Sequence, residues 1–315
     1  MYSYANYQKA KEIIESRRTS AIATADARNE EVRELSEKIA TIDRELTGTG
    51  LLLFKTACAG GDIEPIKKRN LELVAARRAE LVRLGLGEDY TDVKYTCAKC
   101  SDSGFIETKM CTCLKEILVM MNIESSGMGA LIDKQSFDNF DLEWYNTDEA
   151  TYKRMARNFR VAKDYAENFG KKCANLLLLG KTGTGKTHIS TAIARTVIAK
   201  GYDVLYDSAQ NIVSVFEDDR FHSGYGEHER RSDKYLECDL LIIDDLGTEF
   251  INQFTVSCIY NLINTRQNRG KSTIISSNLS ADELGTKYEG RVYSRIVGCD
   301  YTVLLFAGND HRVYK

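Results

Sequence analysis

Residues 180–187 have the types and the spacing needed to hold the phosphates of a nucleotide. They read G-K-T-G-T-G-K-T and fit the pattern G-x-x-x-x-G-K-T. Glycines allow backbone N–H groups to close around phosphate oxygens, Lys186 adds a positive charge, and Thr187 offers a hydroxyl to Mg²⁺. An apolar run precedes the loop and a helical segment follows it, so a chance glycine-rich turn is the weaker interpretation. The residues expected to contact the nucleotide are Gly180, Thr182, Gly183, Thr184, Gly185, Lys186 and Thr187.

A second motif consists of two acidic residues, Asp244 and Asp245. They directly follow the apolar run Leu240–Ile243, at the end of the buried strand that this run predicts. Open α/β sheets bind ligands at this edge. Asp244 is expected to hold Mg²⁺ through its water shell, and Asp245 to orient or deprotonate the attacking water. Two acids that merely end a strand are the alternative, and the phosphate loop upstream makes it weaker. No N-K-x-D guanine motif occurs, which favours ATP.

Three later residues could complete a hydrolysis site. Asn278 follows the run Thr273–Ser277 and could contact the γ-phosphate or its water. Arg291 and Arg295 are four residues apart and therefore share one helix face. An arginine presented to a neighbouring subunit's γ-phosphate stabilises transition-state charge, and a surface ion pair is the alternative for each.

Four cysteines are spaced as metal ligands: Cys97 and Cys100 form C-x-x-C, and Cys111 and Cys113 form C-x-C. Four thiolates close a tetrahedron around Zn²⁺ and leave no position for water, so the predicted zinc is structural. An iron–sulfur cluster and inert thiols remain as alternatives. The other five cysteines lack such spacing and are predicted to be small buried side chains.

Around these motifs the apolar pattern predicts two kinds of structure. Residues 5–48 read as a helix ended by Gly48 and Gly50, and a second helix runs from Pro65 to about Leu84, with Leu71, Val74 and Leu81 on one side. Beyond Gly129, strand-length apolar runs alternate with helical segments, which indicates an α/β domain with a parallel sheet. The expected division is a helical arm at 1–92, a Cys₄ module at 93–120 and an ATPase domain at 121–315. Expected strands lie at 176–179, 204–206, 240–243, 273–277 and 302–306.

Composition excludes several classes of protein. The net charge of −3 gives no overall basic footprint, so any nucleic-acid contact must be local. No apolar run approaches the roughly 20 residues that cross a bilayer, and residues 1–11 contain no apolar signal core. Nine cysteines in such a chain favour metal binding or buried thiols over disulfides. The expected location is the cytoplasm, with no membrane partner.

The strings GKTGTGKTHIS and LLIIDDLGTE resemble the bacterial replicative-helicase loaders of the DnaC/DnaI type, a branch of the AAA+ ATPases related to DnaA and IstB. His188 after the loop is typical of that branch and implies a further nucleotide contact. RVYSRI resembles the segment that carries the arginine finger, which implies that role for Arg295 and a supporting one for Arg291. Asn278 in SSNLS matches the sensor 1 position. Residues 95–115 resemble the zinc module of the Gram-positive loaders.

The resemblance implies an ATPase that binds a hexameric replicative helicase through its N-terminal part, engages single-stranded DNA and self-associates through its ATPase domain. An IstB-like transposition helper acting on duplex DNA, and an adaptor in which ATP only sets a conformation, are the alternatives. Only nine residues follow the last apolar run, which implies that a full helical lid is lacking, with Arg312 as a partial substitute. The insertion at 208–235 could stack bases and pair phosphates through Phe221, Tyr225, Arg230 and Arg231, or could be a solvated connector.

Overall fold

The computed structural model describes residues 3–171, 174–221, 230–298 and 300–310, except for the side chains of Glu289 and Arg291. The chain divides into two compact units. One comprises Lys9–Leu114, and the other combines Met1–Gln8 with Lys115–Lys315. The first holds most of the N-terminal helices and all four clustered cysteines, and the second holds the phosphate loop. The predicted three-part division remains a proposal.

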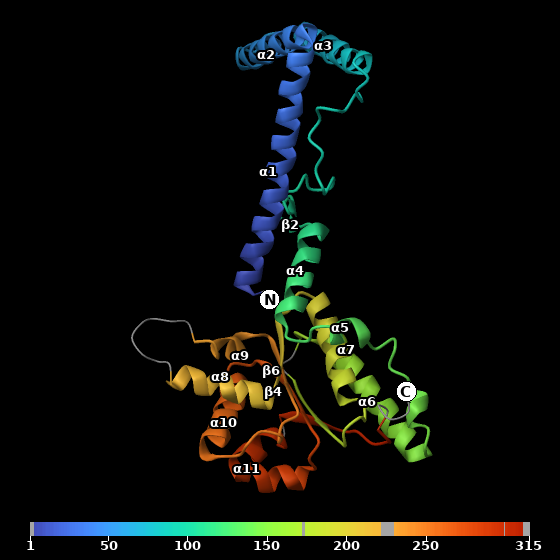
Figure 1. The fold of residues 1–315 in the computed structure, drawn as a ribbon, viewed down its shortest axis with the longest axis vertical. Coiled ribbons are helices and arrows are strands. Elements are labelled where there is room, and N and C mark those ends of the chain that lie inside the picture. Colours follow the sequence, from blue (N-terminus) through green and yellow to red (C-terminus); the bar gives the residue numbers. More distant parts are fainter. Residues whose placement is uncertain (1–2, 172–173, 222–229, 299, 311–315) are drawn as a thin grey trace. The chain divides into compact units, whose positions relative to one another are not determined.

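The second unit is built on a five-stranded parallel sheet in the order β4-β5-β6-β3-β7 (Figure 1). All five expected strands are present, because a parallel strand covered on both faces reads as a continuous apolar run. Between the phosphate-loop strand β3 and the acidic strand β5 lies β6, which places three carboxyl ends side by side. The strands are β3 (Asn175–Leu179), β4 (Val204–Ser208), β5 (Leu240–Asp244), β6 (Ser272–Ser277) and β7 (Tyr301–Leu305).

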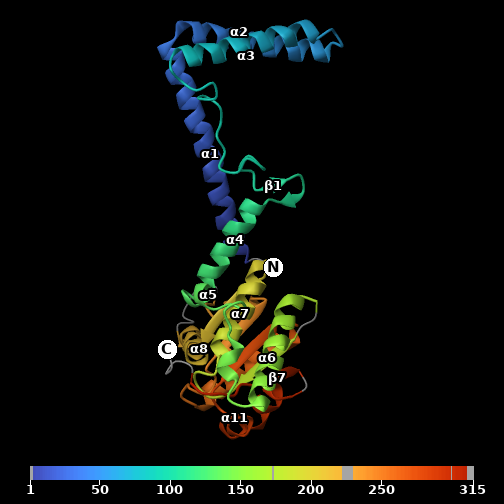
Figure 2. The ribbon, with the colours of Figure 1, turned by 90° about the vertical axis from the view of Figure 1, so that its right-hand side faces the viewer.

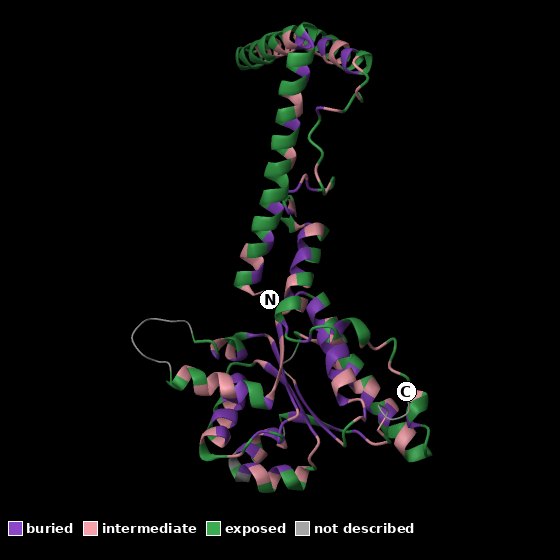
Figure 3. Cartoon of the chain, viewed as in Figure 1, coloured by how far each residue is buried: buried purple, intermediate pink, exposed green. Residues whose placement is uncertain are grey.

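Helices cover both faces of this sheet (Figure 2), and its three central strands, β5, β6 and β3, are buried (Figure 3). Alternate side chains of β3 enter the two cores: Leu176 and Leu178 face one, and Leu177 and Leu179 the other. The first core includes residues of α6 (Glu149–Asn168) and α7 (Lys186–Ala199). The second core includes residues of α8 (Ala209–Phe221), α9 (Asp233–Glu237), α10 (Gln253–Asn268) and α11 (Ala281–Ile296).

Shorter elements lead into the sheet. They are α4 (Thr112–Ser125), α5 (Leu131–Lys134) and the 3₁₀ turn η1 (Leu142–Tyr145). Gly127, just after α4, has φ +80, and a Cβ there would lie 2.4 Å from the carbonyl oxygen of Tyr206 in β4. Only glycine permits that approach. The change in the apolar pattern of the sequence near Gly127 therefore coincides with the place where the chain reaches the edge of the sheet.

The first unit contains α1 (Tyr4–Leu35) from Lys9 onward, α2 (Glu37–Cys58), α3 (Glu64–Arg83) and the short strands β1 (Phe105–Ile106) and β2 (Lys109–Met110). The prediction of one helix over 5–48 was wrong. The helix is interrupted at Ser36, whose hydroxyl accepts a hydrogen bond from the N–H of Ile39 and caps α2. Helix α2 then continues through Gly48 and Gly50. Packing outweighs the glycine penalty, because α2 lies against α3 and the Thr49 hydroxyl accepts from Asn70 at 3.1 Å.

Pro65 lies in the first turn of α3, as predicted, but only part of the expected side of that helix is buried. Leu73 and Leu81 are buried, whereas Leu71 is 70% exposed. The carboxylate of Glu80 is also buried, and it accepts from the hydroxyl of Ser36 at 3.2 Å and from Lys38 at 3.1 Å. Its hydrogen bonds from Arg83, Lys38 and Ser36 lower the pKa of Glu80 to about 2, so it stays ionised where the two helices meet.

Two further expectations from the sequence concern membrane-spanning helices and a helical lid after the last strand. Among the described residues, no helix is both long enough and apolar enough to cross a membrane. After β7 the structure describes residues 306–310, and no helix occurs in them. Arg312, suggested as a substitute for a lid arginine, lies outside the described residues.

Candidate nucleotide site and cysteine cluster

The phosphate loop connects the carboxyl end of β3 to the first turn of α7, so the positive end of the helix dipole faces the loop. Gly185 is the N-cap of α7, with φ +91. A Cβ at this position would lie 2.4 Å from the hydroxyl oxygen of Tyr145. Glycine is therefore required here both by backbone conformation and by the approach of a buried tyrosine. Thr184 is buried as well, and its hydroxyl donates to the carbonyl of Lys181 at 2.7 Å.

Lys186 is buried inside this loop, with 5% of its surface exposed. Its ammonium group donates to the carbonyl oxygens of Gly180 at 2.6 Å and Lys181 at 2.8 Å, and to the side-chain oxygen of Asn278 at 2.7 Å. A buried ammonium must satisfy its donors in this way. Phosphate oxygens entering the loop can take over these hydrogen bonds, so the lysine is already oriented for an anion.

The two acids at the end of β5 lie in different environments. Asp244 is buried, and its carboxylate accepts hydrogen bonds from the hydroxyls of Tyr206 in β4 and Ser276 in β6. Asp245 is partly exposed and has φ +53, a left-handed conformation that a non-glycine residue rarely adopts. Such strain occurs mostly at functional sites. Asp245 lines the same cavity as residues of the phosphate loop.

Asn278 joins the loop to the acids. Its oxygen accepts from Lys186, and its side-chain N–H donates to the Asp245 carboxylate at 3.1 Å. The sheet order explains this position, because β6 lies between the strands that carry the other two residues. Lys186, Thr187, Asp245 and Asn278 all line one cavity of about 560 Å³, a size suited to a nucleotide. The structure thus brings these predicted site residues together.

Sequence reasoning missed the aromatic wall of this cavity, which comes from the segment between α5 and α6. Tyr145 donates to the carbonyl oxygen of Thr184 at 3.1 Å, and its ring stacks on Phe140 with centroids 5.6 Å apart. Trp144 also lines the cavity and is 38% exposed. Flat apolar rings beside a phosphate loop provide a surface on which a purine base can stack. The aromatic density of FDNFDLEWY was the available sequence signal.

His188 lies in the same wall. Its Nε2 atom is 2.9 Å from the carbonyl oxygen of Ser136 and 3.0 Å from the side-chain oxygen of Asn139. Both neighbours are acceptors, so Nε2 carries the proton. The imidazole also meets the ring of Phe140 edge-on. His188 therefore holds the aromatic segment against α7 in addition to lining the cavity.

The two arginines lie on α11, and Arg295 is not among the described residues that line the cavity. Arg295 is in the last turn, where its backbone carbonyl accepts from Gln267 at 3.3 Å. Within the described part of the chain, its partly exposed guanidinium makes no hydrogen bond or ion pair. The side chain of Arg291 lies outside the described residues, so its predicted role stays a prediction.

The insertion that was considered for DNA contact is described at 208–221 and 230–235. Phe221, the last residue of α8, is 76% exposed. Arg231 is exposed too and lies 3.8 Å from the carboxylate of Asp218. Tyr225 lies outside the described residues. Neither a DNA-contacting role nor that of a solvated connector is tested by these positions.

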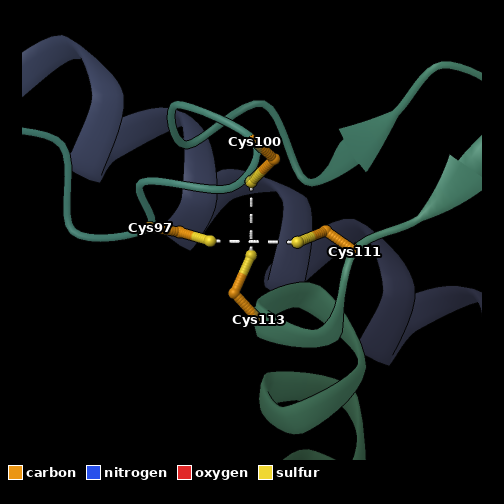
Figure 4. Close-up of side chains that lie close together, drawn as sticks. All are labelled: Cys97, Cys100, Cys111 and Cys113. Carbon is orange, nitrogen blue, oxygen red and sulfur yellow. Dashed lines mark hydrogen bonds between the residues drawn. The ribbon is translucent and has the colours of Figure 1, made fainter.

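The four clustered cysteines come together in the first unit, and their sulfur atoms lie within 4.8 Å of one another (Figure 4). Cys97 and Cys111 are 3.8 Å apart, and Cys100 and Cys113 are 3.5 Å apart. The buried carboxylate of Asp102 shapes the first knuckle by accepting from the N–H groups of Thr96 and Cys97 at 2.7 and 2.9 Å. Of the remaining cysteines, Cys238 and Cys258 are buried as predicted, Cys58 is exposed, and Cys173 and Cys299 lie outside the described residues.

These distances fit one Zn²⁺. Four sulfurs at about 2.3 Å from a central zinc form a tetrahedron with edges of about 3.8 Å. An iron–sulfur cluster contains several iron and sulfide atoms, and four thiolates this close together leave no room for it. The backbone N–H of Cys113 is the main cause that lowers the pKa of Cys111 to about 7, so one ligand is already prone to ionise. The cysteine set favours a closed structural zinc site.

We expect the purified protein to contain about one zinc per chain. Cys111→Ser should lose the metal and destabilise the first unit, because zinc binding is coupled to folding. Cys58→Ser, which removes an exposed cysteine outside the cluster, is the matched control and should keep the zinc. Elemental analysis and thermal melting with and without a chelator measure both effects. A brown, iron-containing protein, or full zinc content in Cys111→Ser, would contradict the assignment.

A parallel sheet in this strand order, a phosphate loop before α7 and paired acids at the end of β5 define an ATP-binding P-loop protein of the AAA+ class. The model of the IstB-like ATP binding protein family matches residues 127–294, more than half of the chain. The chain belongs to this family.

Curated relatives carry a more particular name. The chain is 28% identical over 171 residues to "Replicative helicase loader DnaC" of Escherichia coli K12, a match over 54% of this chain and 66% of that protein. It is 25% identical over 189 residues to the protein of the same name from Buchnera aphidicola subsp. Acyrthosiphon pisum, over 60% and 74%. The match to the Escherichia coli relative thus covers just under two thirds of its length.

Solved structures of similar fold are described as the DnaC helicase loader and as DnaI. The first aligns with a TM-score of 0.45 at 22% identity, over 54% of this chain and 98% of the other. The second aligns with a TM-score of 0.46 at 20% identity, over 59% and 95%.

Proposed function

We propose that this protein is an ATP-dependent loader that binds a hexameric replicative DNA helicase and places it on single-stranded DNA. The observation that carries the proposal is the match of more than half of the chain to relatives named replicative helicase loader. The nucleotide site supports it, because it has the parts of a phosphate-driven switch. We do not favour a transposition helper, although the family model bears the IstB name, since these curated relatives bear the loader name.

In this proposal the residues around the cavity divide the work on ATP. The backbone of the phosphate loop and Lys186 hold the β- and γ-phosphates. Asn278 fixes the positions of Lys186 and Asp245 relative to each other, because it hydrogen-bonds to both. Asp245 orients the water that attacks the γ-phosphate and accepts its proton. Thr187 and Asp244 offer the hard oxygen donors that Mg²⁺ prefers, and the ion would neutralise charge on the phosphates.

The surface proposed to meet the helicase is the exposed apolar patch on the C-terminal half of α2. The side chains of Leu51, Leu52 and Phe54 are 60%, 53% and 69% exposed, although α2 itself packs against α3. Apolar side chains grouped on a surface mark sites where another protein binds. A helix face with an aromatic anchor suits an apolar groove on the partner.

The test is co-purification of the full chain with the replicative helicase of its own host. We expect wild type to form a complex, and the triple variant Leu51→Ser, Leu52→Ser and Phe54→Ser to weaken it about 30-fold or more, because hot-spot residues each contribute 2 kcal/mol or more. Val82→Ser, which changes an exposed apolar residue of α3, is the control and should bind normally. Absence of any complex with the wild-type chain, with tight binding to duplex DNA instead, would favour the transposition helper.

A further inference from the structure

The carboxylate of Asp244 is held from both sides by hydroxyl groups. Tyr206 of β4 donates to one of its oxygens, and Ser276 of β6 donates to the other. These two strands flank β5 directly, so the acid lies between its two neighbours in the sheet. Each carboxylate oxygen keeps a free lone pair after accepting one hydrogen bond. The acid is therefore fixed in orientation while it can still accept hydrogen bonds from metal-bound water.

Tyr206 is fixed through its main chain as well as through its hydroxyl group. The backbone of Tyr206 is itself held, because its N–H donates to the carbonyl of Ser126 at 2.7 Å beside Gly127. The tyrosine comes from an edge strand that is anchored by the segment after α4.

We propose that Tyr206 is a positioning residue for magnesium, which together with Ser276 orients the Asp244 carboxylate that would hold Mg²⁺. This inference rests on the proposed ATP-binding function. It extends that function by naming the residues that orient a magnesium ligand before the ion binds. Hydrogen-bond partners of metal ligands generally act in this way, by fixing ligand orientation before the ion arrives.

The decisive variant is Tyr206→Phe, which removes one oxygen and keeps the ring in the sheet edge. We expect the Mg²⁺ concentration that gives half-maximal ATP binding to rise about tenfold, because loss of such a partner typically costs 10–100-fold in metal affinity. Binding of ATP in excess EDTA should stay equal to that of wild type. A fluorescent ATP analogue titrated at a series of Mg²⁺ concentrations measures both quantities without any turnover.

Tyr235→Phe is the matched control. It also removes a tyrosine hydroxyl that donates to an aspartate, but the acceptor is Asp207, at 2.7 Å, and not Asp244. We expect its Mg²⁺ requirement to match wild type. Ser276→Ala removes the opposite hydroxyl and should raise the requirement in the same direction, so it tests the idea even if Tyr206→Phe fails to fold. An unchanged or lowered Mg²⁺ requirement in both folded variants would overturn the inference, whereas a wild-type chain that binds no ATP would overturn the proposed function instead.

Discussion

Lys186→Ala is expected to abolish ATP binding at concentrations that saturate the wild-type protein. The ammonium group is buried and already surrounded by three oxygen acceptors, so it meets the phosphates without reorganisation. Removing one partner of such a buried charge pair costs about 2–5 kcal/mol, which corresponds to a loss of affinity of about 30-fold to a few thousandfold. Titration with a fluorescent ATP analogue measures the change directly.

Lys181→Ala supplies the control for charge in the same loop. Lys181 is exposed and serves the loop through its backbone carbonyl, which alanine retains. Its removal should alter ATP affinity by less than about threefold, because exposed charges contribute little. A thermal melt of both variants shows whether the loop still folds. Equal losses in the two variants would mean that general positive charge, and not the buried ammonium, binds ATP.

The sheet and the phosphate loop could be predicted because their signals are local. Each buried parallel strand is a continuous apolar run, and the loop is defined by consecutive residues. The helical hairpin was predicted less well. Gly48 and Gly50 favour a helix end in isolation, and only the packing of α2 against α3 shows why the helix continues past them. Leu71 was placed on the wrong side because a stripe of apolar residues does not say which side finds a partner.

The contacts that complete the nucleotide site depend on strand order, which the local pattern does not encode. Tyr206 reads as an ordinary strand residue, and it meets Asp244 only because β4 lies beside β5. Tyr145 is far from the phosphate loop in sequence and reaches Thr184 across the fold. Asn278 was easier to predict, since it directly follows an apolar run, as the acids do. The cysteine cluster was predictable for the same reason as the loop: its spacing is short.

Arg295→Ala is expected to leave ATP binding unchanged and to lower ATP turnover by about a thousandfold in the assembled protein. An arginine that approaches the γ-phosphate from a neighbouring subunit contributes about 10³–10⁵ to the rate. Arg295 suits this role because its guanidinium is partly exposed and lies outside the cavity of its own chain. Phosphate release at protein concentrations that permit assembly measures turnover, and Arg269→Ala, which breaks an exposed ion pair with Glu237, is the control.

Mixing two inactive variants separates a contribution between subunits from one within a chain. Asp245→Asn should still bind ATP and still present Arg295, but should not activate the attacking water. Arg295→Ala has an intact cavity and lacks only the arginine. When the two are mixed, a chain with the intact cavity can meet a neighbour with the intact arginine, so a fraction of wild-type turnover should return. Mixtures that stay as inactive as the separate variants, under conditions where the chains co-assemble, would show that Arg295 does not complete a neighbour's site.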